Sequence, residues 1–545
     1  MLIQNTESKV RILRKPAIIR HIKYVAVWVF FTLITVGALT TCRSPQKTEL
    51  RKLVPNDAII YLETENIART LESLTASQAF QRLAGSVPDY SIFENMQIAV
   101  AVTGFETTAE NAVLNFKPRF VAVAETHAWS WQTVSIAENQ LAGLVVKNFG
   151  NDAKLEKTYR DGGTFFTWTA SDNRRVYAFI RGSLIYFGTD AAAIEKCLAI
   201  QKGETESLAI NESLTRVYTE NNLAFGYVSL EGVKQIAALA GVSVAVEATE
   251  EADGRSFVAE ILPQILQNTT REIIWTANKT ERGIKDVFSI SLTTETASVL
   301  KEILKTAAQP TGDSIDFLPT EFYSATRYNL ESPLTAWRGL LFVTTKNTDA
   351  ARGNLLLRFS DSLLEPYGIS NAGTFLSQID SEILTAQFDA AGERSAAIVT
   401  VKDAEKLKSS ISKEINFQLA PTMRNNAEIW FSEDKRIAAA FVENKLILGD
   451  EESVLKCLRT KQSRKSFAEN SAFQLFSNSK SAAATFGTDY DSAEKIVGVL
   501  AVNKNGNEKP ATFYFTETRF DEKGIERVTV SDFGLLGTIL KQLEK

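Results

Sequence analysis

The chain has 545 residues, a length that allows several domains of about 100–200 residues each. Hydrophobic residues make up 44% and charged residues 23%, so the chain can bury a large core and global disorder is excluded. Two histidines and three cysteines exclude a disulfide framework and most His-rich or Cys-rich metal sites, so we expect neither a metal ion nor a cofactor.

The first 41 residues have the composition of a membrane anchor. Residues 1–24 carry six basic side chains and one acidic one, and residues 24–41 carry no charge. A helix over residues 24–41 is about 27 Å long, close to the thickness of the hydrocarbon core of a bilayer. The positive-inside rule places the basic leader, residues 1–23, in the cytoplasm. We therefore predict a single-pass membrane protein whose bulk is extracytoplasmic, in the periplasm or on the cell surface.

An alternative use of the same segment is a cleaved lipoprotein signal. Leu39-Thr40-Thr41-Cys42 places a cysteine directly after the apolar run, so Cys42 is a candidate for lipid attachment. The residue before it is threonine, whereas a bacterial lipobox has Gly, Ala or Ser there. The long basic lead and the full spanning length favour a retained signal-anchor, with residues 42–52 as a tether.

Strand and helix signals follow one another along the exterior chain. Beta-branched and aromatic residues between turn signals predict strands, and apolar residues at i, i+3 and i+4 after Asp190 and Asp450 predict helices with these aspartates as N-caps. The elements expected in the first part are a strand at Arg119–Thr126, a helix at Ser135–Phe149, and strands at Thr164–Ala170, Arg175–Ile180 and Leu184–Phe187. Those expected in the second part are a strand at Ala396–Val401 and a helix at Asp403–Ile411.

The chain contains an internal repeat. Phe165–Asp190 is similar to Ile429–Asp450, and each segment leads into a Lys-Cys-Leu triplet. The match continues upstream at Pro55 and Pro319, and ordered matches of this kind indicate a colinear duplication. The residue pairs that we expect to superpose are Trp168 with Trp430, Phe179 with Phe441, Cys197 with Cys457, and Gly283 with Gly524.

These signals predict an α+β fold. After the transmembrane helix we expect two tandem duplicated domains, each a mainly antiparallel sheet covered by helices on one side. Gln309–Ser314 has the Pro/Gly/Ser character of a linker. The expected domain map is a leader at 1–23, a membrane segment at 24–41, a tether at 42–52, repeat one at 53–308, a linker at 309–316 and repeat two at 317–545.

Two short motifs resemble a known family. They are Leu53-Val54-Pro55-Asn56-Asp57-Ala58 before a strand, and Gly188-Thr189-Asp190 before a short helix. Both are similar to the uncharacterised bacterial family catalogued as domain of unknown function 3352, frequent in cyanobacteria. The resemblance covers residues 50–545 and implies a membrane-anchored, extracytoplasmic protein. The family brings no catalytic residues to this chain.

The candidate chemical groups each have a structural interpretation that we favour. His127 is the only histidine outside the leader, and histidine is the usual base of a Ser–His–acid catalytic site. No Gly-x-Ser-x-Gly motif accompanies it, and a strand-to-helix junction accommodates a polar ring without a catalytic role. Cys197 and Cys457 occupy core positions of short helices, so we expect them to be buried, unpaired and inert. Trp168 and Trp430 are expected in the core rather than in a carbohydrate platform.

Two further motifs carry no predicted site. The acidic stretch Glu247–Asp253 lacks the pattern of a calcium loop, and Asp532-Phe533-Gly534 resembles a kinase triplet without the other kinase motifs. We therefore assign no catalytic, cofactor-binding or metal-binding residue. Outside the leader, 54 basic and 64 acidic residues give a net charge of −10, which argues against nucleic acid.

Two classes of function stay open. The favoured one is a non-enzymatic binding or scaffold protein of the cell envelope, whose partner is a protein, a glycan or a lipid. The alternative is an envelope hydrolase that acts on glycans with paired carboxylates. A deep pocket with two carboxylates would favour the hydrolase.

Overall fold

A computed structural model describes residues 48–541. The segments left out of the description are 111–112, 150–152, 218–221, 248–260, 262, 309–312, 361–363, 365–366, 419, 425–426, 460–466, 468, 490 and 504–509. The predicted membrane segment 24–41 and Cys42 therefore lie outside the described residues. In the part that is described, none of the helices is both long enough and apolar enough to cross a bilayer.

The first half of the chain alternates strands and short helices. Its elements up to the end of the meander are η2 (Leu50–Leu53), β1 (Ile60–Thr64), α2 (Ile67–Thr75), α3 (Gln78–Leu83), β2 (Ala84–Ser86), η3 (Ser91–Phe93), β3 (Gln97–Glu110), β4 (Val113–Glu125), α4 (Ser130–Ile136), the π-helix η4 (Ala137–Leu141), α5 (Ala142–Phe149), β5 (Lys154–Arg160), β6 (Gly163–Thr169), β7 (Arg175–Arg181) and β8 (Leu184–Gly188). They are followed by α6 (Ala191–Gln201), η5 (Leu208–Ile210), α7 (Glu212–Val217), β9 (Ala224–Val228), α8 (Leu230–Glu247), β10 (Thr270–Thr280), β11 (Gly283–Leu292) and α10 (Thr294–Ile303).

The second half repeats this plan. Its elements up to the end of the meander are η6 (Asp313–Phe317), β12 (Ser324–Asn329), α11 (Pro333–Lys346), α12 (Ala350–Phe359), α13 (Ala372–Ser377), β13 (Ile379–Gln387), β14 (Ser395–Val401), α14 (Ala404–Glu414), β15 (Thr422–Arg424), β16 (Ala427–Phe431), β17 (Ala438–Val442) and β18 (Lys445–Gly449). They are followed by α15 (Glu451–Arg459), α17 (Ser471–Asn478), β19 (Ala483–Asp489), α18 (Ser492–Leu500), β20 (Val502–Asn503), β21 (Thr512–Phe520), β22 (Gly524–Ser531) and α19 (Gly534–Lys541).

Both halves arrange their strands in the same order. The first half runs β5-β6-β7-β8-β4-β3-β1-β9-β10-β11, with every neighbouring pair antiparallel. The second half runs β15-β16-β17-β18-β14-β13-β12-β19-β21-β22, also antiparallel. The repeat found in the sequence is therefore visible in the strand order.

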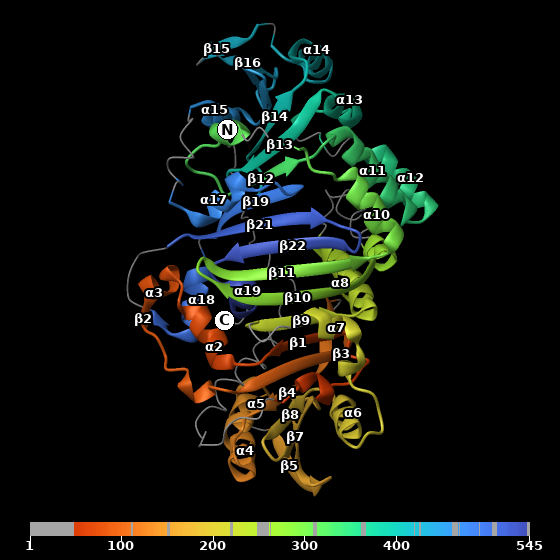
Figure 1. Ribbon diagram of the computed structural model, residues 1–545, viewed down its shortest axis with the longest axis vertical. Coiled ribbons are helices and arrows are strands. Elements are labelled where there is room, and N and C mark those ends of the chain that lie inside the picture. The colour runs from red at the N-terminus through yellow and green to blue at the C-terminus, as the bar shows by residue number, and fades with distance from the viewer. Residues whose placement is uncertain are drawn as a thin grey trace, which may run out of the picture.

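The two halves form one continuous sheet. Strand β11 pairs with β22 over Ile284–Ser291 and Gly524–Ser531, and this pairing, which we call the seam, joins the last strand of each half (Figure 1). Within the described residues, all twenty strands outside a small β2–β20 pair belong to this sheet. The expectation of two separate tandem domains is wrong, because backbone hydrogen bonding continues from one half into the other.

Helices cover both faces of the sheet, which corrects the expectation that they cover one side. Alternate residues of β3 show this directly: Ile98, Val100 and Val102 belong to one core cluster, and Ala99 and Ala101 to another. In a strand, successive side chains point to opposite faces. The first cluster is completed by α2, α3, α18 and α19, and the second by η2 and α6.

Helices also cross the seam in both directions. Helix α10 of the first half contacts β21 and β22 of the second, and α19 of the second half contacts β11 of the first. Helix α18 packs against α3 (Figure 1), and β2 pairs with β20. Residues of α18 and α19 belong to the same core cluster as α2 and α3. Each half thus completes the core of the other.

The register of the two antiparallel meanders, β5–β8 and β15–β18, corrects two of the expected superpositions, Phe179 with Phe441 and Trp168 with Trp430. Gly188 pairs with Tyr177 and Gly449 pairs with Ala438, so Phe179 corresponds to Ala440 rather than to Phe441. Phe179 lies in the cluster that holds Cys197, whereas Phe441 and Cys457 lie in different clusters. A slip of one residue moves a side chain to the opposite face of a sheet.

A longer turn is the reason for this shift. The last backbone pairs before the turns are Ala170 with Arg174 in the first half and Ser432 with Ile437 in the second, so the second turn is one residue longer. Trp430 pairs with Ala439 and therefore corresponds to Phe166, two positions from Trp168 on the same face. Equal spacing in the sequence did not imply equal register.

Candidate functional site

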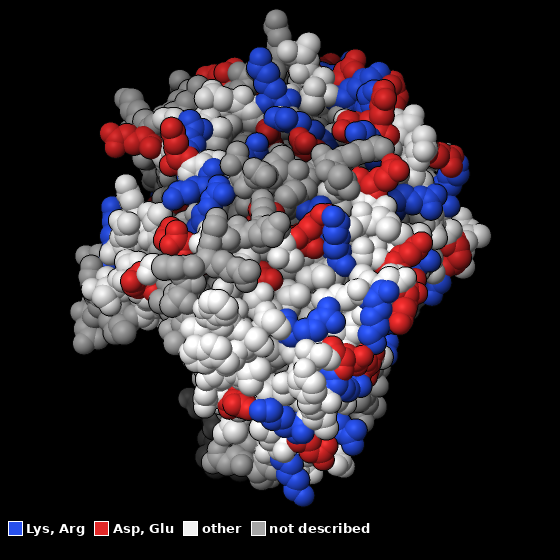
Figure 2. Space-filling model, turned by 60° about the horizontal axis from the view of Figure 1, so that its bottom comes forward, with Lys and Arg blue, Asp and Glu red and all other residues white. Residues whose placement is uncertain are grey.

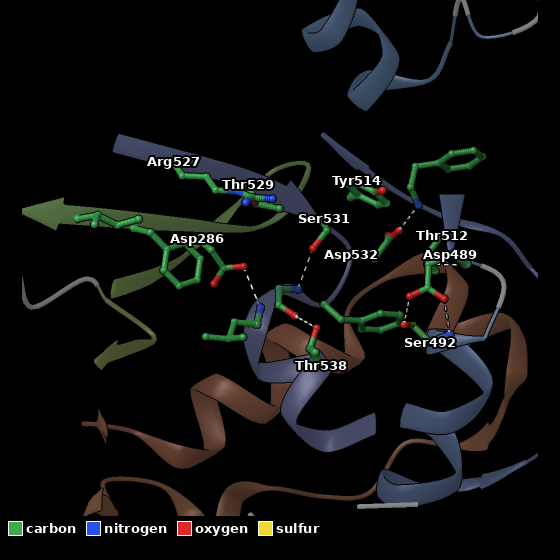
Figure 3. A pocket seen from close by; sticks show the side chains of 17 residues that line it. Asp286, Asp489, Ser492, Thr512, Tyr514, Arg527, Thr529, Ser531, Asp532 and Thr538 are labelled. Carbon is green, nitrogen blue, oxygen red and sulfur yellow. Dashed lines mark hydrogen bonds between the residues drawn. The ribbon is translucent and has the colours of Figure 1, made fainter. Parts of the chain in front are cut away.

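A pocket of about 430 Å³ lies beside the seam, between the sheet and the start of α19 (Figure 3). We call it the seam pocket. Its floor is formed by side chains of β11, β21 and β22. Its wall is formed by the first turn and a half of α19, together with Asp489 at the end of β19 and Ser492 at the start of α18. Both halves of the repeat contribute, because β11 belongs to the first and all the other lining elements to the second.

Asp286 of β11 is the most deeply buried charged group of the seam pocket, with 2% of its surface exposed. Its Oδ1 accepts a hydrogen bond from Trp275 Nε1 at 2.8 Å, and its Oδ2 accepts one from the backbone N–H of Leu535 at 2.9 Å. Burial raises the pKa of Asp286 to about 6, although both hydrogen bonds act in the opposite direction. Asp286 thus holds the start of α19 against the sheet from the other half.

Two more carboxyl groups lie on the other side of the start of α19 (Figure 3). Burial raises the pKa of Asp532, which accepts one hydrogen bond from the Phe513 N–H at 3.4 Å. Asp489 accepts hydrogen bonds from the Ser492 hydroxyl and from Lys541 Nζ. Burial opposes the ionisation of Asp489, but these bonds, the Asp491 N–H and the charge of Lys541 together lower its pKa. One pocket therefore holds carboxyls with pKa values shifted in opposite directions.

The rest of the seam pocket is mainly apolar. Phe288, Phe513, Tyr514 and Phe533 supply aromatic walls, and the exposed Arg527 is the one basic residue among its lining residues. Asp286 and Arg527 occupy corresponding positions of β11 and β22, since Gly283 corresponds to Gly524 in the two hairpins. Corresponding positions of the two halves thus hold an acidic and a basic side chain, and both line the floor of the seam pocket.

This arrangement suits a ligand with an apolar body and hydrogen-bond donors. Ligand pockets are typically apolar with a few convergent polar groups, and carboxyl groups in poorly solvated positions favour donors or cations. Among the described residues, Asp532 has a single hydrogen-bond donor, so it retains acceptor capacity. No cluster of His, Cys, Asp and Glu suited to a metal ion occurs in the described part of the chain.

His127 lies outside this pocket. It follows β4 at a strand-to-helix junction, as expected, and adopts a positive φ of 51°. Its backbone N–H donates to Glu125 Oε1 at 2.9 Å, and its Nδ1 lies 3.9 Å from the same oxygen. The structure does not bring His127 together with any residue that lines the seam pocket.

The two exterior cysteines are buried and free, as predicted. Cys197 in α6 and Cys457 in α15 are 0% and 1% exposed. Burial raises the pKa of Cys457 to about 12 and that of Cys197 still further, so both thiols stay protonated at neutral pH. The aspartates before these helices act as N-caps: Asp190 accepts from the Ala192 and Ala193 N–H groups, and Asp450 from Ser453 N–H.

Trp168 belongs to the core, as expected, and Trp430 packs against the edge of another core cluster. Trp168 is 3% exposed and stacks on Phe166 at 5.6 Å, while Trp430 is half-buried and donates to Glu428 Oε1 at 2.8 Å. The acidic stretch lies largely outside the described residues, with Glu247 as the last residue of α8.

The residues of the seam pocket carry almost no signal in the sequence. Asp532-Phe533-Gly534 lacks the other kinase motifs and so predicted no site, yet all three residues line the pocket. Gly534 has a φ of +60°, and a Cβ there would lie 2.8 Å from Asp286 Oδ2, so glycine is required for this close approach. An Asp and a Gly between a strand and an apolar helix are the only local signal.

Comparison with known proteins gives little. No family model matches the sequence, and no curated protein matches it. Among solved structures, the chain is similar to crystal form III of TP0453, with a TM-score of 0.20 and 9% identity over 44% of this chain and 99% of that chain. Crystal form IV of TP0453 matches with a TM-score of 0.20 and 8% identity over 43% and 97% of the two chains. These scores are too low to assign a fold or a function.

Proposed function

We propose that this chain is a membrane-tethered, extracytoplasmic binding protein of the cell envelope without enzymatic activity, and that the seam pocket is its ligand site. The basic leader and the uncharged segment 24–41 support the tether and the extracytoplasmic location. The observation that carries the proposal is the seam pocket itself, which the two halves build together. Pockets often lie where two structural units meet.

The ligand that fits this pocket is compact, with an apolar body and at least one hydrogen-bond donor. The aromatic side chains Phe288, Phe513 and Phe533 would bury the apolar part, and Asp532 would accept the donor. Asp286 contributes indirectly, since both of its oxygens already accept hydrogen bonds from the protein. It fixes the wall of the pocket rather than the ligand.

Native mass spectrometry of the full-length protein, extracted from its own membranes in detergent, tests this proposal. Wild-type protein should carry a small-molecule adduct. Thr529→Trp, which fills the pocket from β22, should lose that adduct. The matched control is Thr518→Trp on the neighbouring strand β21, half-buried but outside the pocket, which should keep it. An adduct retained equally by both variants would place the ligand elsewhere.

One observation favours the hydrolase as a second candidate. Asp286 and Asp489 line one pocket with pKa values raised and lowered, the pattern of an acid and a base in catalysis. Against it, the oxygens of both groups are already held by protein donors. Release of soluble sugars from cell-wall glycan by wild type, and loss of this activity in Asp489→Asn, would place the hydrolase first.

A further inference from the structure

Large apolar side chains are exposed at one end of the molecule. Trp129 and Trp131 at the start of α4 have 57% and 67% of their surface exposed, and Leu155 and Tyr159 of β5 have 46% and 78%. We call these four residues the aromatic tip. Leu155 and Tyr159 pair with Trp168 and Thr164 of β6, so they point to the same face of the sheet.

The aromatic tip lies at the outer end of the first half. Strand β5 is an outer strand, since within the described residues it pairs with β6 only, and α4 and β5 lie together at the lower end of Figure 1. Figure 2, turned so that this end comes forward, shows acidic and basic side chains interspersed over the visible surface. A surface of this kind would be recognised through its rings rather than through a basic patch.

The described chain begins close to this end. The backbone of Thr48 is held on both sides by Gln97, whose Oε1 accepts from the Thr48 N–H at 3.0 Å and whose Nε2 donates to the Thr48 carbonyl at 2.9 Å. The Thr48 hydroxyl donates to Glu125 Oε2 at 3.3 Å. Glu125 ends β4, and Trp129 follows only four residues later, at most about 14 Å along the chain.

The tether is short compared with the sheet. Only residues 42–47 separate the predicted membrane segment from Thr48, and the seven backbone steps from Thr41 to Thr48 span at most about 25 Å when fully extended. Twenty strands spaced about 4.8 Å apart extend over roughly 90 Å. A tether of about 25 Å that ends near β4 keeps the first-half end of the sheet close to the bilayer, whereas β15 lies at the opposite end of the sheet.

We infer that the aromatic tip docks into the headgroup region of the membrane that holds the anchor. The inference rests on the proposed function, which supplies the anchor at residues 24–41. Tryptophan and tyrosine favour the membrane interface, because their rings have an apolar body and a polar edge. With the tether and the tip both bound, the long axis of the molecule is fixed relative to the bilayer, and the seam pocket is held away from it.

Quenching of tryptophan fluorescence by brominated phosphatidylcholine tests this inference. The full-length protein is reconstituted in vesicles of phosphatidylcholine with a fifth of phosphatidylglycerol. Of the seven tryptophans, we expect quenching of Trp28 in the anchor and of Trp129 and Trp131 at the tip. Trp129→Phe/Trp131→Phe should remove two of these three quenchable groups. The matched control Met423→Trp places an exposed ring on the opposite outer strand β15 and should add no quenching.

A second set of variants separates docking from mere proximity. Tyr159→Trp serves as the reporter. The fluorescence of this added tryptophan should be quenched when Trp129 and Trp131 are replaced by Phe. It should not be quenched when both are replaced by Ser, since serine removes the apolar surface. If Trp28 is quenched and the double Phe variant is quenched to the same extent as wild type, the docking inference is wrong but the proposed anchor is retained. If Trp28 is not quenched, the anchor itself is wrong.

Discussion

At the scale of single residues, Asp286 links the two halves of the protein. Its carboxylate joins the first-half strand β11 to the second-half helix α19 through the Leu535 N–H, 249 positions away in the chain. Its two hydrogen bonds favour the ionised form, but burial outweighs them and raises the pKa of Asp286 to about 6. Its effect on stability therefore depends on pH.

The sign of this dependence follows from the raised pKa. Below pH 3.8 Asp286 is protonated in the folded and unfolded states, and as pH rises from there through 6 only the unfolded state gains from ionisation. Between pH 4 and pH 7, the free energy of unfolding of wild type should thus fall by about 3 kcal/mol relative to that of Asp286→Asn. Asparagine serves as the reference because it mimics the neutral acid. Urea denaturation midpoints of both proteins at several pH values measure this difference.

Asp489→Asn is the control of opposite sign. The pKa of Asp489 is lowered, so the stabilisation from its ionised form is present above the unfolded pKa of 3.8 and is lost as pH falls below it. Asp489→Asn should therefore be less stable than wild type at pH 7 and approach it in acid. Parallel pH profiles for wild type and Asp286→Asn would show that Asp286 has an ordinary pKa.

At the scale of elements, the seam depends on two glycines at corresponding positions. Gly283 and Gly524 begin β11 and β22 with φ values of +115° and +146°. A Cβ at Gly524 would lie 2.2 Å from the Ile290 carbonyl oxygen, and one at Gly283 would lie 2.4 Å from the Ser531 carbonyl oxygen. Each close contact is with the backbone of the other half, so these glycines allow the two sheets to join.

We expect Gly524→Ala to destabilise the protein more than an ordinary glycine substitution. Gly182 is the matched control: it has a φ of +64°, and a Cβ added there would meet no heavy atom within 4 Å. Gly182→Ala should cost about 1 kcal/mol from backbone conformation alone. Gly524→Ala adds a clash with backbone and should cost about 2–4 kcal/mol. Equal shifts of the two denaturation midpoints would mean that the seam tolerates a side chain at position 524.

At the scale of the whole molecule, we expect the halves to behave as one folding unit. Eight residues of each seam strand are paired, and α18 and α19 complete a core cluster of the first half. The halves are therefore held together by the seam and the shared core. The predicted linker at 309–316 is wrong for residues 313–316, which belong to the 3-10 helix η6 with Ser314 and Ile315 fully buried. The entropic cost of closing a loop grows slowly with its length, so a longer linker should cost little and should leave the halves joined.

A protease site placed within residues 309–312 tests this unity. After cleavage, the two fragments of the purified full-length protein should co-elute on size exclusion and unfold in a single transition. Ten added Gly/Ser residues at the same place should lower the free energy of unfolding by less than about 1 kcal/mol. Fragments that elute separately, each with its own transition, would show instead that the halves are independent domains.

The sequence by itself determined the local features. Strand positions in the meander, the N-caps at Asp190 and Asp450 and the burial of both cysteines depend on residues within a few positions of each other, and such contacts leave a readable pattern. The predicted strand at Arg119–Thr126 ends one residue after β4, although β4 begins six residues earlier, at Val113.

Only the tertiary structure decided how the halves meet. The pairing of β11 with β22 and the contact of Asp286 with Leu535 join segments about 240 positions apart. Backbone hydrogen bonds between strands carry no residue code, so no spacing in the sequence could indicate the seam or the pocket beside it. The register of Phe441 was likewise set by one extra turn residue, because a shift of one position reverses the face of every side chain that follows.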